Sequence, residues 1–219
     1  LFCSDLGYGQ TLVGVSPDVT INWAGVVTAD EDATFDNGFG LVARADLGSL
    51  PAGADVIAYA VDPAGGTSLM AFETAVDLGA GVVARPGDVV KFDGFAYSLE
   101  FEAASEGLSP GARVDAVAFD PSGLILSFDT TVALGGLVAD DEDLVFWQGP
   151  GTASVVLDGS GVGMPPELDV DAFEFLPDGR FLLSFDTAGA LDNIRFDDDD
   201  LVTFNGNSFE MYFDGEAVD

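Results

Sequence analysis

The residues of this chain best suited to chemistry are runs of consecutive acids. Three such runs occur, at 30–32, 140–143 and 197–200, and each stands just before a stretch expected to form a β-strand. Alternate residues of an extended chain share one side, so the two members of each pair could converge on one ion. The pairs are Asp30 with Asp32, Asp141 with Asp143, and Asp198 with Asp200.

Calcium is the cation that such runs would suit. It takes about 6 to 8 oxygen ligands, so backbone carbonyls, water and a second segment would have to complete the shell. Asp129 and Asp186 follow an earlier expected strand at matching positions and are possible donors. The alternative is an acidic rim that faces water, or an acidic surface adapted to a saline habitat.

Charge and composition exclude several classes of function. The 219 residues hold 39 Asp and Glu against 6 Lys and Arg, with no His, for a formal net charge of -33. Binding to nucleic acid or to anionic membranes needs clustered cations, and an imidazole base or ligand is absent. The single Cys3 forms no intramolecular disulfide. No apolar run reaches the roughly 18 residues of a membrane span, so no membrane insertion is expected.

Carboxylates alone can catalyse hydrolysis of glycosides, so an enzyme stays possible. Catalytic acids are expected to depart from a structural repeat, a criterion that selects Glu73, Glu100 and Glu102. The alternative reading of these glutamates is ordinary sequence drift in a diverged repeat.

Internal repetition is the strongest signal in the sequence. Residues 114–123 (VDAVAFDPSG) match 170–179 (VDAFEFLPDG), about 57 residues further along the chain, and the motif LSFDT occurs at both 126–130 and 183–187. Four copies are predicted within a single domain, 1–219. Their approximate bounds are 1–56, 57–114, 115–170 and 171–219.

Each copy is predicted to form four short strands, with a connection of about a dozen residues after the second strand. Four equal units favour an all-β fold, a four-bladed β-propeller, whose blades are small antiparallel sheets around an axis. Phe128 and Phe185 occupy equivalent positions and are expected to pack between neighbouring blades. The alternative architecture is a β-sandwich or a wide barrel.

The repeat starts, Val114-Asp115-Ala116-Val117 and Val170-Asp171-Ala172-Phe173, resemble those of the hemopexin-type four-bladed propeller family. In that family these strand starts line a central channel that holds ions, which implies metal-binding roles for Asp115 and Asp171. The whole repeat also resembles repeats in secreted bacterial proteins of unknown function, which implies an extracellular or cell-surface location.

The function predicted from these observations is a secreted or cell-surface module for binding or assembly, non-enzymatic and stabilised by calcium. Its expected ligand is a protein or glycan at the cell surface, and self-association is a further possibility. The alternative function is a propeller hydrolase that acts on a glycan or ester through carboxylates or a bound metal ion.

Overall fold

A computed structural model describes residues 2–4, 12–15, 21–23, 26–29, 32, 34–36, 41–44, 47–62, 66–176 and 178–215. Strands dominate this part of the chain, and the predicted all-β class is confirmed. The regular segments are short and rich in Val, Leu and Phe, the residue types that suit a pleated, half-buried surface.

Four antiparallel sheets of four strands each form the body of the protein, and within each sheet the strands follow one another in chain order. The first sheet comprises β1 (Phe2–Ser4), β2 (Leu12–Val15), β5 (Thr34–Asp36) and β6 (Leu41–Arg44). The second comprises β7 (Val56–Val61), β8 (Ser68–Phe72), β11 (Val89–Phe92) and β12 (Tyr97–Phe101). The third comprises β13 (Val114–Asp120), β14 (Gly123–Phe128), β17 (Leu144–Gly149) and β18 (Thr152–Leu157). The fourth comprises β19 (Val170–Phe175), β20 (Phe181–Phe185), β23 (Leu201–Phe204) and β24 (Phe209–Phe213).

The connection after the second strand of each sheet contains a further hairpin, which was not predicted from the sequence. The hairpins are β3 (Ile21–Trp23) with β4 (Val26–Thr28), β9 (Val76–Gly79) with β10 (Val82–Ala84), β15 (Val132–Leu134) with β16 (Leu137–Ala139), and β21 (Gly189–Leu191) with β22 (Ile194–Phe196). Gly135 and Gly136 turn the third hairpin with φ angles of 60° and 88°, the left-handed backbone that a two-residue hairpin turn requires.

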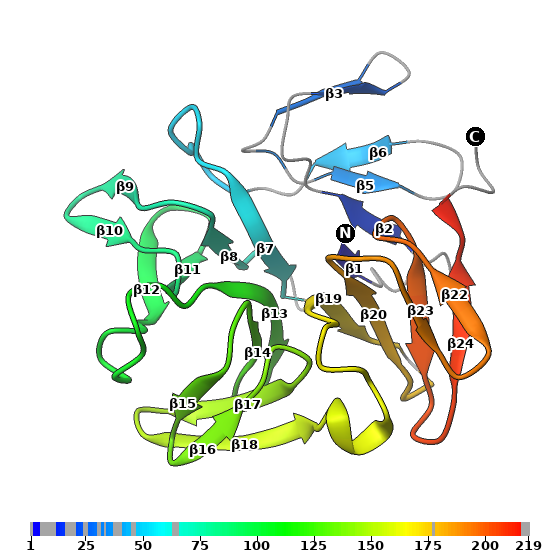
Figure 1. The fold of residues 1–219 in the computed structure, drawn as a ribbon. Coiled ribbons are helices and arrows are strands. Elements are labelled where there is room, and N and C mark those ends of the chain that lie inside the picture. Colours follow the sequence, from blue (N-terminus) through cyan, green and yellow to red (C-terminus); the bar gives the residue numbers. More distant parts are fainter. Residues whose placement is uncertain are drawn as a thin grey trace.

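The first strands of the four sheets meet around the centre of the molecule (Figure 1). Strand β7 contacts β13, β13 contacts β19, β19 contacts β1, and β1 contacts β7, which closes a ring. Strands β7, β13 and β19 each begin one residue before the predicted repeat boundary.

Both faces of the third sheet are buried, each against a different neighbour. Val117, Leu126 and Phe128 join the apolar cluster shared with the second sheet. Ala116 and Ile125, which point to the opposite face, join the cluster shared with the fourth sheet. Burial on both faces explains why the strands of this repeat are almost continuously apolar.

Phe128 packs between two sheets, as predicted from its repeated position. Its ring centroid lies 6.2 Å from that of Phe101 on the second sheet, and Phe101 in turn meets Trp147 of the third sheet edge to face at 5.2 Å. The equivalent Phe185 is also fully buried, with its ring 4.8 Å from Phe196 of the fourth hairpin. These aromatic contacts hold neighbouring sheets and hairpins together.

Replacing Phe128 with Ala should lower the free energy of unfolding by about 3–5 kcal/mol, because it opens a cavity between the second and third sheets. Chemical denaturation measures the effect. Phe95→Ala is the control, since the Phe95 side chain is 95% exposed, and it should change stability by less than about 0.5 kcal/mol. Equal effects of the two substitutions would contradict the assignment of Phe128 to the inter-sheet core.

Candidate functional site

The last acid of the runs 140–143 and 197–200 is a structural group that joins two segments of its own sheet. One carboxylate oxygen of Asp143 accepts a hydrogen bond from the backbone N–H of Asp140 at 3.1 Å, within the same turn. The other accepts from the N–H of Gly159 at 2.9 Å, just after the last strand of the sheet. Asp143 thereby ties the turn before β17 to the chain that leaves β18.

The same arrangement recurs in the second and fourth sheets. Asp200 accepts from the N–H groups of Asp197 and Gly215, both at 2.8 Å. Asp88 accepts from the N–H groups of Arg85 and Ala103, both at 2.9 Å, and is completely buried. We call Asp88, Asp143 and Asp200 the clamp aspartates.

The second sheet has the clamp although no acidic run precedes its clamp aspartate, Asp88. Asp88 follows Arg85-Pro86-Gly87, yet it makes the same two hydrogen bonds as Asp143. Asp32, the fourth equivalent, accepts from the N–H of Ala29 at 3.0 Å. The final acid of the run therefore belongs to the scaffold of each repeat, whatever residues precede it.

The other predicted calcium ligands of the runs differ in exposure. Asp198 is exposed, Asp141 is half-buried, and Asp30 lies outside the described residues. Among the residues that the structure describes, no three acidic side chains are close enough to form a ready-made metal site.

Glu142 is buried at the centre of the run 140–143, and its Oε2 atom has no hydrogen-bond partner within the described chain. Burial raises the pKa of this carboxyl, and the neighbouring charges of Asp143, Asp141 and Asp140 raise it further. An ionised Glu142 therefore destabilises the folded state.

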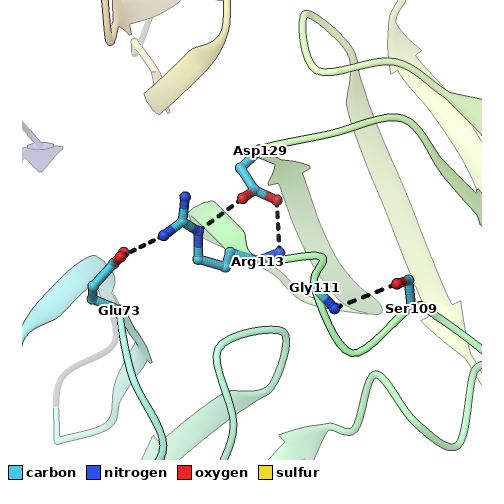
Figure 2. A network of polar contacts seen from close by, with 5 residues as sticks. All are labelled: Glu73, Ser109, Gly111, Arg113 and Asp129. Atoms are coloured by element: carbon cyan, nitrogen blue, oxygen red, sulfur yellow. Dashed lines mark hydrogen bonds and ion pairs between the residues drawn. The ribbon is translucent and has the colours of Figure 1, made fainter.

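The side chain of Arg113 bridges the second and third sheets (Figure 2). The Nε atom of Arg113 lies 2.7 Å from one carboxylate oxygen of Asp129, and its backbone N–H donates to the other oxygen, also at 2.7 Å. The Nη1 atom of Arg113 forms an ion pair with Glu73 of the second sheet. Glu73, one of the three catalytic candidates, is therefore a structural ion-pair partner.

The remaining catalytic candidates also have partners. Glu100 lies 3.4 Å from the Nζ atom of Lys91 on the adjacent strand β11. Glu102 accepts a hydrogen bond from the hydroxyl of Ser105 at 2.5 Å.

The third and fourth sheets meet at a different set of charges. Asp169 precedes β19 as Arg113 precedes β13, and the backbone hydrogen bonds confirm the equivalence. The N–H of Asp186 donates to the carbonyl of Asp169, and the N–H of Asp129 to that of Arg113, both at 3.2 Å. An aspartate thus occupies the place of the bridging arginine.

Seven aspartates contribute to the electrostatics of this place, which we call the acidic junction. Its members are Asp115, Asp129, Asp141, Asp169, Asp171, Asp186 and Asp198. Six of them are predicted metal-site residues, which tertiary structure brings into one neighbourhood. Asp169 was missed, although its alignment with Arg113 was available as a signal.

Asp115 and Asp169 form the centre of the acidic junction, with their carboxyl groups within hydrogen-bonding reach of each other. Both oxygens of Asp115 and Oδ1 of Asp169 are inaccessible to solvent and have no hydrogen-bond donor among the described residues. Burial raises the pKa of Asp115 well above its ordinary value, and the charge of Asp169 adds to the shift. Burial also raises the pKa of Asp169, followed by the charges of Asp186 and Asp141.

The outer members of the acidic junction differ in exposure. Asp171 accepts a hydrogen bond from the hydroxyl of the buried Ser184. Asp186 is exposed, and burial of part of its carboxyl together with the charges of Asp171, Asp141 and Asp198 raises its pKa. The acidic junction therefore reaches from a buried carboxyl pair to solvent.

A cleft of about 590 Å³ lies beside the fourth hairpin and has a mixed charged lining that includes Arg195, Asp197 and Asp214. Asp200 also borders it, but this residue is a clamp aspartate. The other predicted metal-site residues lie away from the lining of this cleft.

Asp143→Asn should lower the free energy of unfolding by about 2–3 kcal/mol, because an amide cannot accept both backbone hydrogen bonds of the clamp. Chemical denaturation monitored by tryptophan fluorescence measures the loss. The control is the exposed Asp198→Asn, for which a change below about 0.5 kcal/mol is expected. If Asp143→Asn were as stable as the wild type, the clamp would not contribute to folding.

Glu142→Gln should raise the melting temperature at pH 7, because it removes a buried charge from a run of four acids. A raised carboxyl pKa favours folding only where the group is protonated. The gain should therefore shrink as the pH falls through the raised pKa of Glu142, and it should be lost below the ordinary glutamate value of 4.5. Calorimetry from pH 4 to 8 tests this, with the exposed, equivalent Asp199→Asn as a control of smaller expected effect.

Comparisons with known proteins leave the family open. No family model and no curated protein matches the chain, so the resemblance to hemopexin repeats gains no support. Among solved structures, a candidate 6-phosphogluconolactonase from Bacteroides uniformis is similar at 9% identity and a TM-score of 0.33. The match covers 89% of this chain and 65% of that protein.

Within the described residues, no helix has the length and apolar character needed to cross a bilayer.

Proposed function

We propose that this chain is a non-enzymatic module for binding or assembly, built as a four-bladed β-propeller and located outside the cell or on its surface. Support for the architecture comes from four sheets with strands in chain order and from the ring of first strands. Such a ring gives a rigid body on which loops and hairpins are presented to a ligand.

The observation that carries this proposal is the use of the repeated acids. The clamp aspartates accept two backbone hydrogen bonds each, so their carboxylates are committed to holding the sheets together. The glutamates that depart from the repeat are engaged by Arg113, Lys91 and Ser105. The carboxylates therefore serve the scaffold, and binding falls to other side chains.

Phe95 is the side chain best placed to contact a ligand. It is 95% exposed at the turn between β11 and β12. The Asp93 carboxylate fixes this turn by accepting from the N–H groups of Phe95 and Ala96, both at 2.9 Å. An aromatic ring on a fixed turn loses little conformational entropy on binding, and it can pack on a protein or stack on a sugar.

Exposed valines recur at one position of three hairpins. Val27 is 48% exposed, Val83 46% and Val138 66%, and each is the middle residue of the second hairpin strand. Single exposed valines are ordinary, but repetition at one phase gives several hairpins a similar apolar outer surface. This repetition favours a protein partner, including a second copy of the chain, over a small substrate.

Phe95→Ser should weaken ligand binding by about tenfold or more, as expected for an exposed aromatic anchor. Binding of the immobilised chain to a glycan panel and to purified cell-surface proteins gives the measurement, and sedimentation velocity tests self-association. Val155→Ser, another exposed apolar position on β18, is the matched control and should leave affinity unchanged.

The same purified protein should be assayed for hydrolysis of glycan and ester substrates. Turnover that survives repurification would overturn the non-enzymatic assignment. Equal affinities of the wild type and Phe95→Ser for a confirmed ligand would instead remove Phe95 from the binding surface.

A further inference from the structure

The contacts between sheets carry opposite charges at equivalent places. Between the second and third sheets, the guanidinium of Arg113 lies against two carboxylates, Glu73 and Asp129. Between the third and fourth sheets, Asp169 takes the position of Arg113 and Asp186 takes that of Asp129. The first contact thus places a basic group between two acidic groups, whereas the equivalent positions of the second contact hold acidic groups alone.

The centre of the acidic junction lacks compensation within the described chain. Both oxygens of Asp115 and Oδ1 of Asp169 have neither a hydrogen-bond donor nor contact with solvent. Arg113 is the cation whose charge interacts with Asp115, but its guanidinium binds Asp129 and Glu73. A buried ionised carboxylate without a partner is costly, so the pair needs added positive charge.

We propose that a divalent cation, for which calcium is the probe, binds between Asp115 and Asp169 and joins the third and fourth sheets as Arg113 joins the second and third. Carboxylate oxygens are the ligands that calcium prefers, and water completes shells that protein groups leave open. The exposed Asp186, whose charge acts on Asp169, attracts a cation toward the pair from the solvent side.

This site differs from the loop sites expected from the acidic runs. Its central residues come from β13 and from the residue before β19, so the cation would bridge two sheets. The outer acids Asp129, Asp171 and Asp186 supply negative potential around it. The inference is independent of the proposed binding function and can hold whether or not Phe95 binds a ligand.

The test measures the melting temperature of the full chain after treatment with a chelator, then with added CaCl₂ at constant ionic strength. Calcium at 100 times its dissociation constant should raise the melting temperature by about 5–10 °C. Isothermal titration calorimetry should give a stoichiometry of one for this saturable site. Parallel titration with MgCl₂ shows whether the site discriminates between the two ions.

Asp169→Arg reproduces the arrangement of the second and third sheets and is the decisive variant. It should abolish the calcium response while the chelated protein melts at or above the wild-type temperature. Asp115→Asn and Asp169→Asn should weaken calcium binding at least tenfold, and they keep the test valid if Asp169→Arg fails to fold. Asp197→Asn, in an exposed acidic run, is the control and should retain the wild-type response.

Two results would overturn the proposal. One is an equal calcium response in the wild type and in Asp169→Asn, which would place the cation elsewhere. The other is a wild-type melting temperature that neither calcium nor magnesium changes while Asp169→Asn raises it, which would show that the pair shares a proton instead.

Discussion

The interaction on which this fold depends is a buried carboxylate that accepts two backbone hydrogen bonds. Each clamp aspartate joins the turn before the third strand of its sheet to the segment that leaves the fourth strand. Bonds to a charged acceptor are stronger than neutral ones, and burial removes the competition from water. The clamp thus fixes the outer half of a sheet whose inner half is held by the ring of first strands.

With the sheets fixed in this way, packing between them follows from strand geometry. Alternate side chains of the third sheet point to the second and fourth sheets, so this sheet contributes to two apolar clusters. Neither face is left for a polar pattern. This explains how a chain with a net charge of -33 still buries an extensive apolar core.

Identical positions acquire different chemistry because their neighbours differ. Gly87 in the second sheet becomes Glu142 in the third, and the facing Ala103 becomes Gly159. A Cβ atom on Gly159 would lie 2.4 Å from Cγ of Glu142, so the small residue moves to whichever side faces the larger one. The replacement of Arg113 by Asp169 is also a difference between equivalent positions. It leaves a negative charge uncompensated, whereas the paired changes at Glu142 and Gly159 only conserve volume.

The repeats, the all-β class and the packing of Phe128 were predictable because they rest on local apolar patterns. The extra hairpins were not, since strands of three residues such as β15 and β16 are too short to show a period. The Gly135-Gly136 pair was the one local signal of a hairpin turn. The clamp could not be predicted because Asp143 finds a partner 16 residues away, at a backbone N–H that carries no side-chain signature.

By itself, the sequence determined the charge, the absence of histidine, the internal similarity of its segments and the all-β class, because these depend on composition and on neighbours along the chain. Only the tertiary structure decided what each aspartate does. Asp143 faces backbone N–H groups, Asp129 faces a guanidinium, and Asp115 faces another carboxyl. The role of a carboxylate is set by the groups within hydrogen-bonding distance, and folding brings those groups from distant parts of the chain.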